Sequence, residues 1–101
     1  MAKTSAVDKN NRKEKLIQRY KVKRAELREI IRDPNASVEE KFNAQIAMQK
    51  LPRASNACQH RNRCFLTGRP RGVYRRFGLG RNELRKMVMA GLVPGIRKAS
   101  W

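Results

Sequence analysis

The sequence between Glu40 and Glu83 contains no acidic residue, and this one-signed stretch limits what the chain can fold into more than any other feature. Its forty-two positions carry ten lysines and arginines. Like charges at this density repel one another and oppose compaction. The stretch therefore predicts a segment whose compensating charge belongs to a partner molecule. Arginine dominates it, and the guanidinium fork matches phosphate oxygens two at a time.

The charge of the whole chain points the same way. Among 101 residues there are 25 basic and 8 acidic side chains, which gives a net charge of +17. Residues 1–40 carry a net charge of +4 and residues 41–101 a net charge of +13. A basic half of this kind indicates nucleic-acid binding. RNA is favoured over DNA, because irregular basic segments that become ordered on binding suit RNA. In addition, the sequence contains no recognisable DNA-binding motif of two helices with a recognition helix.

The candidate RNA contacts are mostly arginines of the acid-free stretch, joined by one aromatic residue and by the basic tail. A charge run is more often a solvated surface, but the missing acids and the preference for arginine over lysine disfavour that interpretation. Aromatic side chains among the arginines could stack on unpaired bases. We predict contacts at Arg53, Arg61, Arg63, Arg69, Arg71, Tyr74, Arg75, Arg76, Arg81, Lys98 and Trp101.

The aromatic residues Phe65, Tyr74 and Phe77 are also the only large groups available for a small core in the basic half. Phe65 and Phe77 are predicted to be core residues, and for Tyr74 both interpretations stay open. Trp101 is predicted to contact a partner, because a terminal tail is difficult to bury.

The N-terminal half predicts two helices. Apolar residues recur at three- and four-residue spacing from residue 12 to residue 32, while residues 1–11 are small and polar and are expected to be frayed. Asp33 precedes a proline and so ends the first helix. Ser37 and Glu40 form a capping box that begins a second helix, which runs to about Lys50. We expect the helices to form a hairpin, with the second helix packing through Val38, Phe42 and Ile46.

The basic half predicts a looser structure. Residues 52–63 have no apolar period, so we expect them to be flexible alone and extended on a partner. Residues 64–66 and 73–77 predict a short β-hairpin, and residues 80–90 a third helix capped by Gly91. The predicted fold is mainly α with irregular extended segments. It comprises an N-terminal helical extension (1–51), a basic extended linker (52–63) and a small C-terminal RNA-binding module (64–101).

Other functional classes find little support. Zinc requires four ligands, and the chain offers only Cys58, His60 and Cys64. A catalytic Cys–His pair lacks an acid to orient it. Two cysteines are too few for a disulfide framework, the N-terminus is not a signal peptide, and no run approaches a membrane span. We therefore expect no catalysis, no cofactor, no metal, no membrane and no small-molecule substrate.

Three motifs together are highly specific: Thr67-Gly68-Arg69-Pro70, the run from Tyr74 to Leu79, and the run from Lys98 to Trp101. Residues 61–101 closely resemble the C-terminal half of the small ribosomal subunit protein fourteen family. The front part, with Lys23-Arg24-Ala25-Glu26-Leu27 and Leu51-Pro52-Arg53, is similar to the long bacterial or organellar form.

Short members of that family bind zinc through four cysteines with the spacing C-x2-C-x12-C-x2-C. On this chain those positions are Cys64, Thr67, Gly80 and Glu83, so only one of the four ligands remains. The resemblance therefore implies a C-terminal module that is zinc-ribbon-like but lacks its metal.

The resemblance also implies a function. It predicts a structural constituent of the small ribosomal subunit that binds 16S-type ribosomal RNA in the head, supports assembly and shapes the RNA near the aminoacyl-tRNA site. Small-subunit proteins three and ten, and with them protein nineteen, are the implied neighbours. The implied location is the cytoplasmic ribosome, and an organellar ribosome stays open. The alternative is a free-standing basic nucleic-acid-binding regulator with a metal-supported module.

Overall fold

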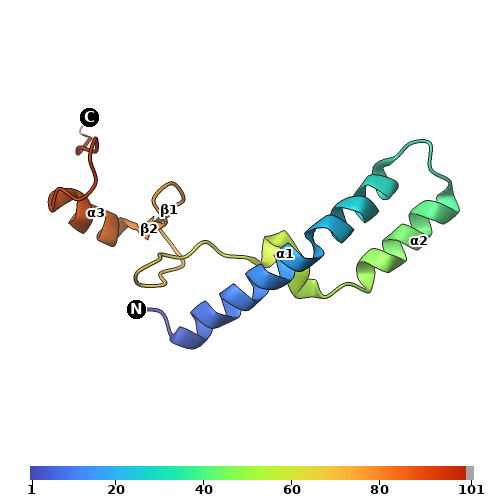
Figure 1. Cartoon of the computed structure of the whole chain (residues 1–101), viewed down its shortest axis with the longest axis horizontal. Coiled ribbons are helices and arrows are strands. Elements are labelled where there is room, and N and C mark those ends of the chain that lie inside the picture. The colour runs from blue at the N-terminus through green and yellow to red at the C-terminus, as the bar shows by residue number, and fades with distance from the viewer. Residues whose placement is uncertain (100–101) are drawn as a thin grey trace. The chain divides into compact units, whose positions relative to one another are not determined.

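The computed structural model describes residues 1–99, and this part of the chain is mainly helical, as predicted (Figure 1). It forms two compact units. One comprises residues 8–60, and the other, which we call the basic unit, comprises residues 1–7 together with the chain from Arg61 onward. No helix within residues 1–99 combines the length and the apolar character needed to cross a bilayer.

The first helix, α1, spans Thr4–Arg32 and is longer than the sequence predicts. It ends before Asp33-Pro34, as expected, but the prediction that residues 1–11 are frayed is wrong. The Ala2 N–H donates to the Thr67 carbonyl at 3.2 Å, and Val7 is partly buried. This contact anchors the start of the helix to a turn sixty residues away, so local composition could not reveal it.

The second helix, α2, spans Val38–Gln49 and begins with the predicted capping box. The Ser37 hydroxyl accepts a hydrogen bond from the Glu40 N–H at 3.2 Å, and the Glu40 carboxylate accepts one from the Ser37 N–H at 3.3 Å. Both interactions satisfy amides that the first turn would otherwise leave without partners. The start of α2 is thus fixed by four consecutive residues.

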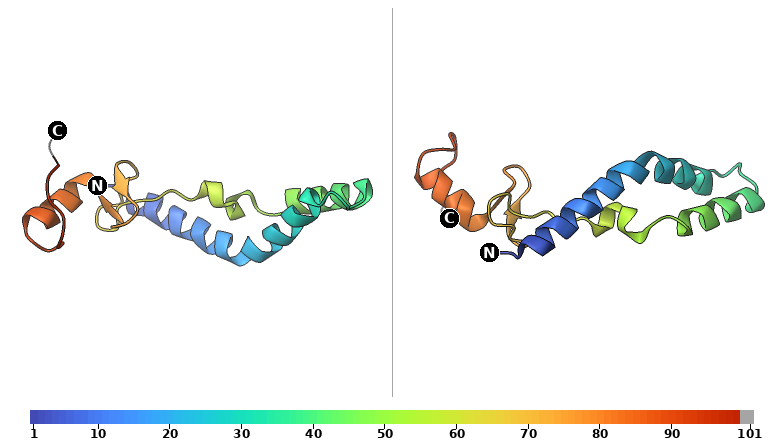
Figure 2. Two further views of the ribbon diagram at one scale, coloured as in Figure 1. Left: turned by 90° about the horizontal axis from the view of Figure 1, so that it is seen from above. Right: turned by 60° about the horizontal axis from the view of Figure 1, so that its bottom comes forward.

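Helix α2 runs back beside the C-terminal part of α1 (Figures 1 and 2), but two of the three residues of the predicted stripe do not pack, and only Ile46 is partly buried. Leu27 and Ile30 of α1 line one groove with the small residues Ala44 and Ala47 of α2, and Ala44 is buried. Phe42 is 62% exposed and Val38 83% exposed, so their predicted packing is wrong. Phe42 precedes Ala44 by two residues, which places the two side chains on opposite sides of a helix.

The predicted linker contains two short 3₁₀ helices, η1 (Arg53–Ser55) and η2 (Ala57–Gln59), so the prediction that these residues are flexible in the free chain is wrong, and the extended conformation on a partner stays a prediction. Ser55 is only 1% exposed. The Arg24 guanidinium donates to the Ser55 hydroxyl at 2.9 Å and to the Pro52 carbonyl at 3.2 Å. Polar contacts across 31 residues order this turn, and a search for apolar periodicity cannot detect them.

The basic unit contains a small antiparallel sheet made of β1 (Val73–Tyr74) and β2 (Leu79–Gly80). The connecting turn closes at Gly78, whose φ is +66°, and the Gly78 N–H donates to the Tyr74 carbonyl at 2.8 Å. The predicted strand at residues 64–66 is wrong. Those residues enter a tight turn in which the Gly68 N–H donates to the Cys64 carbonyl at 2.9 Å.

The third helix, α3, spans Arg81–Met89, within one residue of its predicted start and end. Gly91 adopts a φ of +75° and confirms the predicted left-handed cap. The Gly91 N–H donates to Val88 and the Leu92 N–H donates to Met87, at 3.1 and 3.0 Å. This pair of bonds is the Schellman motif, and it reverses the chain so that the following residues return toward α3.

The core of the basic unit is small. Cys64, Leu79 and Leu84 are buried, and Phe77, Met87 and Val88 pack against them. The prediction for Phe77 is confirmed, whereas Phe65 is 88% exposed and its predicted core position is wrong. So small a core offers little stabilisation, in keeping with a chain whose charge needs a partner.

Candidate nucleic-acid interface

The arginines of the described chain have few acidic neighbours. Apart from Arg61, no arginine within residues 1–99 lies within ion-pair distance of a carboxylate. Within residues 1–99, the Glu83 carboxylate lies 3.0 Å from the Lys86 ammonium, and the Glu14 carboxylate lies 3.9 Å from His60 Nε2. The positive charge predicted from the sequence therefore remains largely uncompensated in the folded chain.

Two of the predicted contact residues bind backbone carbonyls of the chain itself. The Arg61 guanidinium donates to the Pro70 carbonyl at 3.0 Å, and that of Arg63 donates to the Gly68 carbonyl at 2.9 Å. Arg63 is partly buried, and its Nε has no hydrogen-bond partner among the described residues. Both side chains thus fix the turn that contains Gly68 and Pro70.

Other predicted residues are exposed. Arg75 and Arg76 lie in the hairpin turn, and the Arg76 guanidinium lies 5.9 Å from the centre of the Phe77 ring. This cation–π contact limits the orientations of the arginine and leaves its charge in solvent. Arg71 is exposed ahead of β1, and Arg53 is exposed in η1 of the other unit. Trp101 lies outside the described residues.

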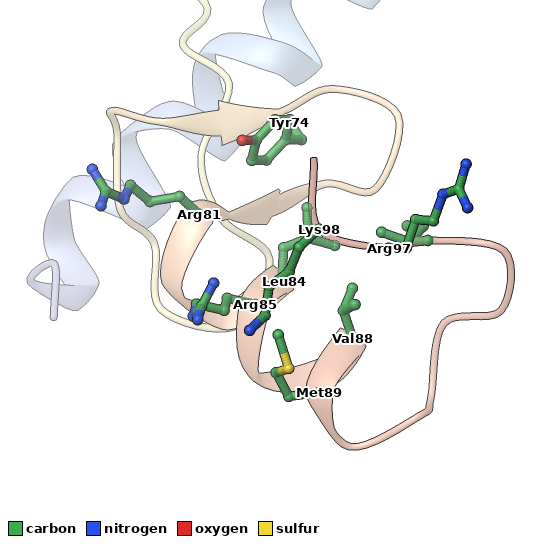
Figure 3. A pocket seen from close by; sticks show the side chains of 9 residues that line it. Tyr74, Arg81, Leu84, Arg85, Val88, Met89, Arg97 and Lys98 are labelled. Carbon is green, nitrogen blue, oxygen red and sulfur yellow. The ribbon is translucent and has the colours of Figure 1, made fainter. Parts of the chain in front are cut away.

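One cavity of about 410 Å³ brings three of the predicted residues together (Figure 3). Tyr74 comes from β1, Arg81 from the start of α3, and Lys98 from the chain that returns after Gly91. The lining also contains two cations that are not among the predicted contact residues, Arg85 and Arg97. Arg85 follows Arg81 by four residues on a helix, and this spacing could have identified it. The apolar lining consists of Leu84, Val88, Met89 and Ile96.

The Cys64 thiol lies in a ring of hydrogen-bond donors. Burial raises the pKa of this thiol, but hydrogen bonds from the Thr67 hydroxyl and from the N–H groups of Gly80, Thr67 and Leu66 outweigh it and lower the pKa from 9.0 to about 7. Hydrogen bonds to sulfur favour the thiolate because they stabilise its negative charge. Within residues 1–99, no three histidine, cysteine, aspartate or glutamate side chains lie close enough together to hold a metal ion.

We expect the Cys64 thiol to titrate near pH 7 in the folded chain and near pH 9 in urea. A folded pKa below the unfolded value means that thiolate stabilisation is complete above pH 9 and is lost as the pH falls through 7. Thiolate absorbance of a Cys58→Ser chain, in which Cys64 is the only thiol, would measure both values. Thr67→Val should raise the folded pKa, and a folded midpoint at or above 9 would contradict the assignment.

Comparison with known proteins places the chain in a family. Residues 47–100 match the family described as Ribosomal protein S14p/S29e. Two relatives named small ribosomal subunit protein uS14, from Stenotrophomonas maltophilia (strain R551-3) and Xanthomonas campestris pv. campestris (strain B100), are 54% and 55% identical. Each alignment covers 100% of this chain and 100% of the relative. The chain therefore belongs to the S14p/S29e family of ribosomal proteins.

Proposed function

We propose that this chain is a structural protein of the small ribosomal subunit that binds ribosomal RNA. The observation that carries the proposal is the identity of more than half of all positions, over the entire length, to proteins named for that subunit. The arginines without carboxylate partners supply the physical reason, since RNA phosphates provide the missing negative charge. The family is one of ribosomal proteins, and its role is structural rather than catalytic.

The finer placement is also a proposal. The partner RNA is of the 16S type, the position is the head of the subunit near the aminoacyl-tRNA site, and the protein neighbours are small-subunit proteins three, ten and nineteen. The relatives come from bacteria, which supports a bacterial ribosome in the cytoplasm over an organellar one. A zinc-ribbon-like origin of the module is also part of the proposal: Thr67 and Gly80 hydrogen-bond the Cys64 thiol, and both stand where the resemblance implies cysteines in short, zinc-binding members of the family.

The basic module of residues 64–101 makes most of the RNA contacts, and residues 1–51 form an extension. Arg61 and Arg63 contribute through the turn that they hold as well as through their charge. The alternative of a free-standing regulator with a metal-supported module has no comparable support, because full-length relatives are ribosomal proteins. The proposed contact residues are those predicted from the sequence, with Arg85 and Arg97 added.

A tagged full-length chain should co-sediment with small ribosomal subunits and should be released by ribonuclease. Arg75→Gln combined with Arg76→Gln removes two exposed charges from the hairpin turn and should lower occupancy severalfold. Lys21→Gln combined with Lys23→Gln removes the same charge from the exposed surface of α1 and is the matched control. A wild-type chain that stays at the top of the gradient would reject the proposed function.

A further inference from the structure

The cavity beside α3 combines features that a phosphate-binding surface alone does not require. An aromatic ring, apolar side chains and four basic residues line it, and its volume is about 410 Å³ (Figure 3). We propose that this cavity binds a single unpaired nucleotide of the RNA, with its base against Tyr74 and its phosphates on Arg81 and Arg85. The inference rests on the proposed function and names the chemical group that this part of the surface recognises.

The apolar part of the cavity fits a base. Tyr74 is 52% exposed, so much of its ring is accessible although the residue belongs to a strand. Leu84, Val88 and Met89 add an apolar wall from α3. A cavity of this volume lies within the range of small-ligand sites. An aromatic ring beside such a wall can stack with an unstacked base, and stacking of this kind is tolerant of sequence.

The charged part of the cavity fits phosphate. Arg81, Arg85, Arg97 and Lys98 line it, and no acidic residue does. Arg81 is the first residue of α3, where a cation opposes the helix dipole, and Arg85 lies one turn later, where the two like charges repel. An anion bound between the two guanidinium groups would offset both their mutual repulsion and the unfavourable interaction of Arg81 with the helix dipole. The arrangement therefore lowers the stability of the free chain and is compensated in the complex.

The backbone holds these groups in place before any ligand binds. The Arg81 N–H donates to the Gly72 carbonyl at 2.9 Å. This bond joins the start of α3 to the end of the loop that precedes β1. A Cβ at Gly72 would lie 3.6 Å from Cγ and Cδ of Arg81, so the arginine stem packs directly over this glycine. The Schellman motif after α3 reverses the chain, and Lys98 of the returning segment also lines the cavity.

An acidic peptide is the other class of ligand that would satisfy the cations. It would leave the Tyr74 ring without a base to stack on, whereas an unpaired nucleotide supplies both the base and the negative charge. The combination of ring and arginine pair therefore favours a nucleotide over a peptide.

The test separates base from phosphate. An RNA strand of eight uridines and a strand of eight abasic ribose phosphates present the same backbone charge to the full-length chain. The wild-type chain should bind the uridine strand roughly tenfold more tightly at low salt. Tyr74→Ala should remove most of that preference, Tyr74→Phe should keep it, and Arg85→Gln should weaken both strands equally. Phe42→Ala, which removes an exposed aromatic from α2, should leave the preference unchanged.

The outcomes distinguish this inference from the proposed function. If both strands bind equally, or if Tyr74→Ala weakens them equally, the nucleotide site is refuted while RNA binding stands. If neither strand nor a 16S-type transcript binds at 50 mM salt, the proposed function itself fails. Binding of an eight-residue glutamate peptide that depends on Tyr74 would assign the cavity to a protein segment instead. Circular dichroism of each variant should match the wild type, and Tyr74→Phe keeps the test valid if Tyr74→Ala unfolds.

Discussion

Binding of this chain to a 16S-type transcript should weaken by about a thousandfold or more between 50 and 200 mM salt. The reason is counterion release, since each arginine that meets a phosphate frees a condensed cation from the RNA. If roughly eight phosphates are contacted, the logarithm of affinity should fall with the logarithm of salt concentration with a slope of about −6. Fluorescence anisotropy with a labelled chain at four salt concentrations would measure this slope.

Variants that each remove two charges test which residues make these contacts. Arg75→Gln combined with Arg76→Gln should make the slope shallower by about 1.5, because two contacts are lost. Lys21→Gln combined with Lys23→Gln should leave the slope unchanged, since these lysines lie in the half of the chain whose acids balance most of its charge. A flat salt response of the wild-type chain would refute arginine–phosphate contacts as the source of affinity. Equal slopes for all three chains would place the contacts elsewhere.

The features that the sequence predicts correctly are local ones. The capping box needs only Ser37 and Glu40, the end of α1 needs only the proline after Asp33, and the left-handed cap needs only Gly91. Each is fixed by the chemistry of a few neighbouring residues, so no knowledge of the rest of the fold is required.

The features that the sequence misses depend on distant partners. Ser55 is ordered by Arg24, and the start of α1 by the carbonyl of Thr67. Phe65 and Phe77 are equally apolar, yet only Phe77 packs against the core, because the Cys64 turn replaces the predicted strand and carries Phe65 into solvent. Periodicity carries no information about such contacts.

The cavity beside α3 likewise combines features that the sequence predicts with features that only the fold determines. Charge and residue type predict Tyr74, Arg81 and Lys98 as separate contacts. Their convergence requires the hairpin, α3 and the chain reversal after α3 together, and this combination also brings in Arg85 and Arg97. Composition predicts which groups could bind an anion, whereas the fold shows which of them line one cavity.

Gly68→Ala should destabilise the basic unit by roughly 2–4 kcal/mol, from backbone strain and steric overlap together. Gly68 is buried with a φ of +74°, a conformation that residues with a Cβ rarely adopt. A Cβ there would lie 2.9 Å from Val7 Cγ2 and 3.1 Å from Ala2 Cβ, closer than ordinary contact allows. Amide exchange of Cys64 and Phe65, whose N–H groups bond within this unit, should accelerate about thirtyfold or more.

Gly78→Ala separates the two contributions to that loss. Its φ is +66°, close to that of Gly68, but nothing lies within 4 Å of the position of a Cβ, so only the backbone strain remains. The difference between the two variants therefore measures the contact of residues 1–7 with the turn, and Val7→Ala should recover part of it in the Gly68→Ala background. Equal losses at both glycines would show that the N-terminus does not dock there, and the start of α1 would then lack its anchor.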